Sequence, residues 1–160
     1  MRIIINMQKI VSIFILLLLT LHSVLAADLQ KGLDAAIKED FETALKEWRP
    51  LAEQGDDKAQ HYLGLMYRRG DGVAKDDTQA VYWYRKAAEK GYSEAQHNLG
   101  FMYAEGKGVA LDYTQAVYWY RKAAEQGNSL SQYGLGFMYD YGKGIAEDDT
   151  QAVYWYRKAA

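Results

Sequence analysis

The sequence predicts an all-α protein, a solenoid built from stacked antiparallel helix pairs. One eleven-residue string, TQAVYWYRKAA, begins three times at intervals of 36 residues, at Thr78, Thr114 and Thr150. A second related segment precedes each copy with the same period, starting at Ala59, Ala95 and Ser131. Self-similarity at 20–50 residues is typical of solenoids, in which each unit packs only against its neighbours.

The first 26 residues have the pattern of a secretory signal peptide. MRIIINMQK carries two positive charges, IVSIFILLLLTL is an apolar run, and small residues follow at Ala26 and Ala27. An uncleaved membrane anchor is the alternative, because the apolar stretch nearly reaches the roughly 17 residues that a span needs. We expect cleavage, a periplasmic or secreted protein, and no stable membrane insertion afterwards.

Residues 27–56 are predicted to form a degenerate helix pair that caps the N-terminal end of the solenoid. The segment DFETALKEWRPLAEQG keeps several repeat positions, including Asp40 and Ala44, which lie 36 residues before Asp76 and Ala80. It carries Pro50 inside its helix, and proline removes one backbone hydrogen bond there.

Three repeats follow, over residues 57–92, 93–128 and 129–160, and each is predicted to contain two helices. The first helices are predicted to start at a polar cap followed three residues later by Gln, the capping-box pattern. These caps are Asp57, Ser93 and Ser129, and the helices end at Gly70, Gly106 and Gly142. The second helices start at Asp76, Asp112 and Asp148, and the first two of them end at Gly91 and Gly127. The third repeat lacks this closing glycine.

A helical wheel divides each helix into a packed and an open side. In the second helix the packed arc holds Ala80, Val81, Tyr84, Ala87 and Ala88, with Trp83 at its edge. In the first helix the packed stripe holds Ala59, Tyr62, Leu63, Met66 and Tyr67. Its other side presents His61, Leu65 and Arg68, then His97 and Phe101, then Tyr133, Phe137 and Asp140.

The segment AQHNLGFMYAEGKGVALDYTQAVYWYRKAAEQG closely resembles the Sel1-like repeat, a relative of the tetratricopeptide repeat. The resemblance implies a right-handed superhelix with first helices on the concave side, and a role as a protein-binding scaffold or adaptor. Some secreted relatives are cysteine-rich and linked to β-lactam chemistry. This chain has no cysteine, so it falls outside that branch.

We expect an exported, non-enzymatic interaction module that binds a peptide or protein partner on the concave face. The expected contact residues are His61, Leu65, Arg68, His97, Phe101, Tyr133, Phe137 and Asp140. A periplasmic inhibitor is the alternative, either a regulator of a sensor kinase or an immunity protein against an exported toxin. A β-lactam-binding hydrolase is a third class, but the chain lacks a Ser-x-x-Lys arrangement and capping explains its serines.

Tyr82, Tyr118 and Tyr154 fall on the polar face of the second helices, where packing does not demand an aromatic ring. They indicate either a secondary contact surface or a relic of recent duplication. The net charge of −2 gives no basic footprint for nucleic acid.

The Gly-x-Gly segments follow helices and are predicted to be turns. The histidine spacing predicts no metal site, with a pH-sensitive contact as a minor alternative, and no cofactor is expected. The last helix, with Trp155 and Tyr156, is a candidate surface for self-association.

Overall fold

The computed structural model describes residues 28–160, so the predicted signal peptide lies outside the described residues. Residues 28–37 are helical, and seven further helices follow. They are α2 (Phe41–Gln54), α3 (Asp57–Arg69), α4 (Asp77–Glu89), α5 (Ser93–Glu105), α6 (Tyr113–Glu125), α7 (Ser129–Asp140) and α8 (Asp149–Ala159). No strand occurs within residues 28–160, so the predicted all-α class is confirmed.

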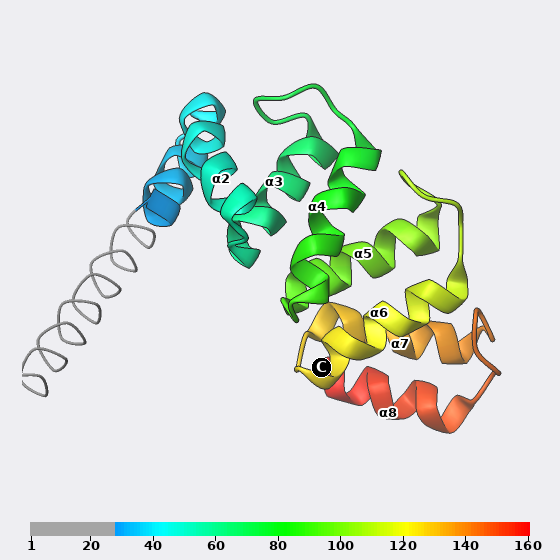
Figure 1. Cartoon of the computed structure of the whole chain (residues 1–160). Helices are drawn as coiled ribbons and strands as arrows, with labels where there is room; N and C mark the ends of the chain where they lie inside the picture. Colours follow the sequence, from blue (N-terminus) through cyan, green and yellow to red (C-terminus); the bar gives the residue numbers. More distant parts are fainter. Residues whose placement is uncertain (1–27) are drawn as a thin grey trace, which may run out of the picture.

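The helices form a curved row in chain order, from the N-terminal helices at one end to α8 at the other (Figure 1). The closest packing joins the two helices of each repeat: α3 with α4, α5 with α6, and α7 with α8. Each second helix also packs against the first helix of the next repeat, as α4 does against α5. This chain of neighbour contacts confirms the predicted solenoid of antiparallel helix pairs.

The second helices start where the sequence predicts. The carboxylates of Asp76, Asp112 and Asp148 accept hydrogen bonds from backbone N–H groups in the first turns of α4, α6 and α8. These bonds satisfy N–H groups that have no partner within the helix. The expected glycine stops are also present, because Gly91 and Gly127 adopt a left-handed conformation just after α4 and α6.

The predicted caps of the first helices are wrong by one residue. Asp56 and Asn128 cap α3 and α7, while Tyr92 precedes α5 and makes no side-chain capping bond. Asp57, Ser93 and Ser129 are instead the first helical residues.

The glutamines of the expected capping boxes have another role. Gln60, Gln96 and Gln132 donate from their side-chain amides to the carbonyls of Ala52, Ala88 and Ala124, at 3.0–3.1 Å. Each buried glutamine thereby adds a second hydrogen bond to a carbonyl near the C-terminal end of the preceding helix, which also accepts from the backbone N–H of the glycine after that helix. The glutamine joins one helix pair to the next rather than closing its own first turn.

A glycine in each first helix lets the second helix approach closely. A Cβ atom on Gly64 would lie 2.5 Å from the ring of Tyr84, and one on Gly100 would lie 2.8 Å from the ring of Tyr120. Gly136 stands in the same relation to Tyr156. Real Cβ atoms do not approach so closely, so these positions need glycine for packing rather than for backbone conformation.

The Gly-x-Gly segments are turns, as predicted, and they also join neighbouring repeats. Gly108 and Gly144 have positive φ angles of 67° and 69°. A Cβ atom on Gly108 would overlap the backbone of Asp77, and one on Gly144 would overlap the backbone of Tyr113. The turn of each repeat therefore rests against the start of the second helix in the repeat before it.

Candidate partner-binding site

His61 is buried, so the prediction that it lines an exposed surface is wrong. Only 7% of the residue is exposed. The rings of Tyr84 and Tyr92 lie 5.9 and 5.2 Å from the imidazole, centre to centre. Its Nε2 atom lies 3.0 Å from the side-chain amide nitrogen of Asn98 on α5. The neighbouring repeat therefore covers the side of α3 that a single-helix wheel leaves open.

His97 occupies the same repeat position and is half-buried. Its Nδ1 atom lies 2.9 Å from the hydroxyl oxygen of Ser131 on α7, and its ring centre lies 5.7 Å from that of Tyr120. Burial, with a smaller contribution from the charge of Arg68, lowers the pKa of His97. The two histidines thus join adjacent repeats along the first helices.

The predicted apolar stripe of Leu65, Phe101 and Phe137 is half-buried. Phe101 packs against the core on both sides of α5, because it touches the cluster centred on α4 and the cluster centred on α6. The Arg68 guanidinium carbon lies 5.9 Å from the centre of the Phe101 ring. The Lys107 ammonium nitrogen lies 5.0 Å from it. These residues contribute to packing between repeats and leave only part of their surface for a partner.

Tyr133 and Asp140 lie on α7, where the surface is more open. Tyr133 is 61% exposed, and its ring centre lies 5.3 Å from that of Tyr156. The Tyr156 hydroxyl donates to the Asp140 carboxylate at 3.3 Å. Burial and the Asp140 charge together raise the pKa of Tyr156 to about 12. The eight predicted contact residues therefore differ in access, from buried His61 to exposed Tyr133.

A groove at the N-terminal end of the solenoid offers a better-formed site, which we call the N-terminal groove. Its volume is about 390 Å³, and it lies between residues 28–37, α2 and α3. Its apolar lining consists of Leu33, Ala36, Ile37, Phe41, Trp48, Tyr62, Leu65 and Met66. The Trp48 and Tyr62 rings stack with centres 4.6 Å apart and planes at 21°. Glu39, Arg69 and Asp71 complete the lining.

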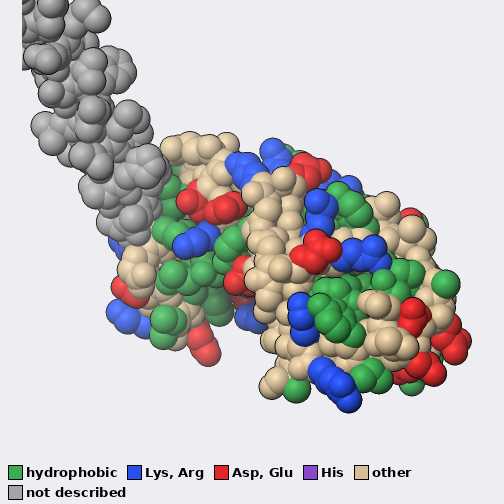
Figure 2. All heavy atoms as spheres, turned by 90° about the horizontal axis from the view of Figure 1, so that it is seen from below, with side chains coloured by type: hydrophobic (Ala, Val, Ile, Leu, Met, Phe, Trp, Pro, Cys, Tyr) green, Lys and Arg blue, Asp and Glu red, His purple; other side chains and the backbone are tan. Residues whose placement is uncertain are grey.

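Sequence reasoning found only Leu65 of this groove. The 36-residue period does not locate the groove, because the first helix pair has a shorter connection than the repeats. Residues 38–40 join its two helices, whereas the longer segment 70–76 joins α3 to α4. The first helix is consequently shifted: Gly32 meets Trp48, whereas Gly64 meets Tyr84. Ile37 lines this groove and is 80% exposed, which only the structure reveals. In the view from below, hydrophobic side chains gather over the N-terminal helices (Figure 2).

The second helices carry the predicted row of exposed tyrosines. Tyr82, Tyr118 and Tyr154 are 46–49% exposed. Each ring meets the following tryptophan edge-on, as Tyr118 meets Trp119 at 4.9 Å and 84°. Lys86, Lys122 and Lys158 place their ammonium nitrogens 5.0–5.1 Å from the tyrosine ring centres. The rings are therefore held in place on a surface that remains open to solvent.

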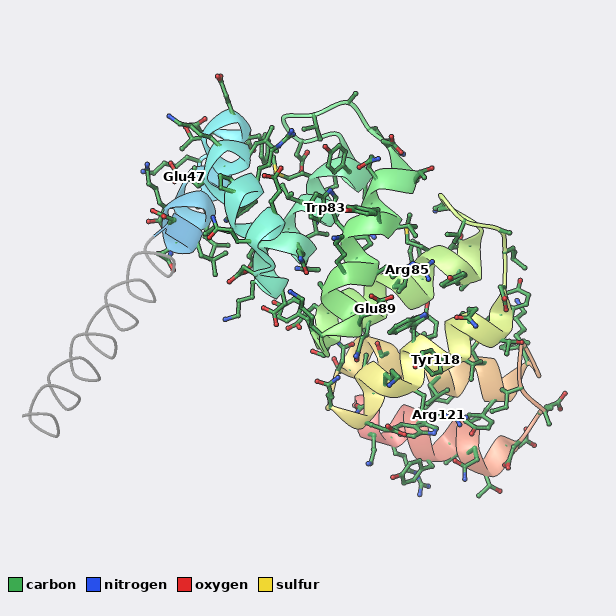
Figure 3. All side chains as sticks on the ribbon, viewed as in Figure 1. Glu47, Trp83, Arg85, Glu89, Tyr118 and Arg121 are labelled. Carbon is green, nitrogen blue, oxygen red and sulfur yellow. The ribbon has the colours of Figure 1, made fainter. Side chains whose placement is uncertain are left out.

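Arginines on the same helices join neighbouring repeats. Arg85 extends from α4 and Arg121 from α6 (Figure 3). Arg85 donates to the Tyr103 hydroxyl at 2.7 Å, and Arg121 donates to the Tyr139 hydroxyl at 3.0 Å. These two arginines are engaged in the fold and are not free contacts for a partner.

The His97–Ser131 pair has the contact that a serine hydrolase uses between nucleophile and base. Ser131, however, is 0% exposed, and its backbone N–H donates to the capping side chain of Asn128. A substrate cannot reach a hydroxyl enclosed in this way, so the pair is structural. Within residues 28–160, no group of three or more His, Asp or Glu side chains is placed to hold a metal ion.

Comparison with known proteins identifies the family. The Sel1-repeat model matches residues 57–92, 93–128 and 129–160. The chain belongs to the Sel1-repeat family. This confirms the resemblance seen in the sequence. Sel1 repeats generally mediate protein–protein interactions and serve as non-catalytic scaffolds. Comparison with curated proteins gives no match.

Solved structures with the same fold include a protective antigen of uropathogenic Escherichia coli strains and a Sel1-repeat protein from Oxalobacter formigenes. The antigen is 43% identical with a TM-score of 0.81, covering 84% of this chain and 30% of its own. The Oxalobacter protein is 36% identical with a TM-score of 0.78, covering 82% of this chain and 54% of its own. The chain thus spans about a third and about half of these relatives.

The cysteine-rich protein B of Helicobacter pylori shares the fold at 24% identity and a TM-score of 0.59, covering 75% of this chain and 86% of its own.

In residues 28–160 of the present protein, none of the helices has the length and apolar character needed to cross a membrane.

Proposed function

We propose that the protein is a non-enzymatic interaction module that binds an apolar segment of a protein partner in the N-terminal groove. The observation that carries this proposal is the groove's lining: eight apolar side chains around a volume of about 390 Å³, with charged residues beside them. Concave, mostly apolar sites with a few polar groups are the usual form of a binding pocket.

The chemistry of the groove indicates what it binds. The stacked rings of Trp48 and Tyr62 provide a rigid apolar surface, and Ile37 stands exposed at one wall. Rigid aromatic anchors dominate the free energy of many interfaces. One or two apolar side chains of a partner would fill the groove, and Arg69 would pair with an acidic residue beside them.

From the signal peptide predicted in the sequence we propose that the partner is in the periplasm or outside the cell. An inhibitor of a sensor kinase or of an exported toxin would use the same groove, with that protein as the partner. Tyr133, Phe137 and the tyrosines of the second helices would add contacts to a larger partner.

Self-association through α8 is a further proposal, but its surface differs from the expected one. Trp155 is only 9% exposed, because it packs against α6 and α7 rather than facing outward. The exposed apolar residues of α8 are Val153 and Tyr154, at 47% and 46%. A second copy would therefore meet these two residues.

A peptide panel tests the groove. Fluorescence polarisation would measure binding of twelve-residue peptides that carry Leu, Met or Phe at the centre of a polar sequence, against an all-polar peptide. We expect the apolar peptides to bind, and Ile37→Glu to weaken binding about tenfold or more by placing a charge in the wall. Val153→Glu adds the same charge at an exposed residue of α8 and should leave binding unchanged. Equal binding by both variants and the unmodified protein would refute the groove as the site.

A further inference from the structure

The joint between the first two Sel1 repeats has a chemical feature that the next joint lacks. The described part of the chain contains two histidines, His61 and His97, one on each of the first helices α3 and α5. Both form hydrogen bonds across a repeat boundary. Their partners differ, since His61 meets an amide and His97 meets a hydroxyl.

With the Asn98 amide oriented as in the structure, its hydrogen bond to His61 uses the neutral form of the ring. The Asn98 side-chain nitrogen can only donate, so the Nε2 atom of His61 accepts at 3.0 Å and the ring proton resides on Nδ1. The Nδ1 atom is buried and has no hydrogen-bond partner within the described residues. A protonated ring would place an N–H group against the Asn98 amide donors, and it would bury a charge among tyrosine rings.

Charged groups around His61 come from two helices. Glu94 on α5 favours the protonated ring, whereas Arg68 and Arg69 on α3 oppose it, as does His97 on α5. The residues that reach it from α4 and the following turn are Tyr84 and Tyr92, which are uncharged at neutral pH. Burial exceeds all of these effects and lowers the pKa of His61 to about 4.

The equivalent joint at His97 can keep its hydrogen bond in either charge state, although burial lowers the pKa of His97 as well. The Ser131 hydroxyl can donate to a neutral imidazole or accept from a protonated one, so the 2.9 Å bond survives a change of charge. Arg68 on α3 is the charged group that faces His97, while α6 brings the Tyr120 ring and α7 the Ser131 hydroxyl. The two joints thus differ in the hydrogen-bond partner of the histidine, while burial lowers the pKa of both rings.

We propose that the joint between repeats 57–92 and 93–128 is an acid-sensitive element: protonation of His61 breaks its bond to Asn98 and separates α3 from α5, while the His97–Ser131 joint stays closed. Folding lowers the pKa of His61, so the unfolded chain binds this proton more readily than the folded one. The stability of the fold is therefore highest at pH values above the unfolded pKa, and it decreases as the pH falls below that value. This proposal does not depend on what the N-terminal groove binds.

Urea unfolding of the whole chain at pH 8 and pH 5 tests it. With a pKa of about 4 in the fold against 6.5 unfolded, His61 alone should reduce the folding equilibrium constant about 30-fold at pH 5. His61→Gln keeps an acceptor for Asn98 but cannot be protonated, so it should lose most of this acid effect. His97→Gln is the matched control and should retain it. Hydrogen exchange, corrected for its intrinsic pH dependence, should show α3 and α5 opening first in the unmodified protein.

A second variant keeps the test decisive if His61→Gln does not fold. Asn98→Asp places a carboxylate where it accepts a hydrogen bond from protonated His61, so acidification to pH 5 should then weaken the fold less than it weakens the unmodified protein. The proposal is overturned if His61→Gln loses as much stability at pH 5 as the unmodified chain. It is also overturned if His97→Gln removes the larger share, or if Asn98→Asp leaves the acid loss unchanged.

Discussion

The ring of Tyr120 lies between two glycines, Gly100 on α5 and Gly134 on α7. Cβ atoms built at these positions would lie 2.8 Å and 3.2 Å from opposite edges of the ring. Tyr120 is only 6% exposed, so the ring cannot swing into solvent to make room. One side chain from α6 thus fixes the approach of its own first helix and of the next one.

Gly100→Ala should destabilise the protein by about 1–3 kcal/mol, since an added methyl group overpacks a filled joint. Gly134→Ala is the matched control: its methyl group meets the same ring at a greater distance, and alanine favours a helix by up to about 1 kcal/mol over glycine. Thermal or urea unfolding measures both. Equal losses in the two variants would contradict the close approach of α5 to α6.

Trp119 and Tyr118 are neighbours in the chain with opposite environments, at 7% and 49% exposure. Trp119 packs with the alanine-rich face of α4. Trp119→Ala should cost about 3–5 kcal/mol in free energy of unfolding, whereas Tyr118→Ala should change it by no more than about 0.5 kcal/mol. A large loss in the tyrosine variant would show that its surface is covered.

Phe101→Ala should lower the free energy of unfolding by about 1–2 kcal/mol, which is between the losses expected for Trp119→Ala and Tyr118→Ala. The reason is that the Phe101 ring is half-buried between two core clusters. The helical wheel alone led us to expect a residue free for binding. If unfolding shows no loss of stability, the ring belongs to an open surface after all.

A substitution at Gln96 tests the hydrogen bond that joins one helix pair to the next. Gln96 donates to the Ala88 carbonyl at 3.1 Å and accepts from Gln126 at 2.7 Å. Gln96→Glu replaces the buried donor with a carboxylate and should cost at least about 2 kcal/mol at pH 7. The loss should shrink at pH 4, because a protonated carboxyl group donates again.

Gln79→Glu is the control for this change, since Gln79 is exposed and lies in the first turn of α4, where a negative charge is favourable. It should be neutral or slightly stabilising. If Gln96→Glu behaves like Gln79→Glu in urea unfolding at both pH values, the glutamine does not hold the two helix pairs together.

Repetition made much of this fold predictable. Asp112 and Gly127 mark the ends of α6 through local backbone chemistry, so a single sequence reveals them. The sequence predicts a capping-box role for Gln96, and this is wrong. A glutamine at that position is compatible both with a capping box and with a hydrogen bond to the preceding helix, and the sequence does not distinguish the two. His61 was misplaced because its cover comes from Asn98, 37 residues away. A helical wheel contains no neighbouring repeat, and therefore cannot show burial between repeats.

The N-terminal groove was unpredictable for a related reason. It forms where the repeat pattern fails, between the short connection at residues 38–40 and α3. A period locates what recurs, whereas a binding site in a repeat protein depends on what differs from unit to unit.

The hydroxyl of Tyr84 is buried and has no hydrogen-bond partner within the described residues, whereas the hydroxyl of Tyr103 accepts from Arg85 at 2.7 Å. Removing an unpaired buried hydroxyl relieves a desolvation cost, so Tyr84→Phe should be neutral or stabilising at pH 7. The same change at Tyr103 should cost about 0.5–1.5 kcal/mol, because it breaks a bond. Urea unfolding of the two variants compares them directly.

Alkaline pH separates the two tyrosine variants further. Burial raises the pKa of Tyr84 to about 12 from 10.0. The unfolded chain therefore loses this proton first as pH rises. At pH 11 this difference should reduce the folding equilibrium constant about tenfold. Tyr84→Phe should remove that share of the alkaline loss. If instead the variant is destabilised at pH 7 by as much as Tyr103→Phe, the Tyr84 hydroxyl has a hydrogen-bond partner in solution.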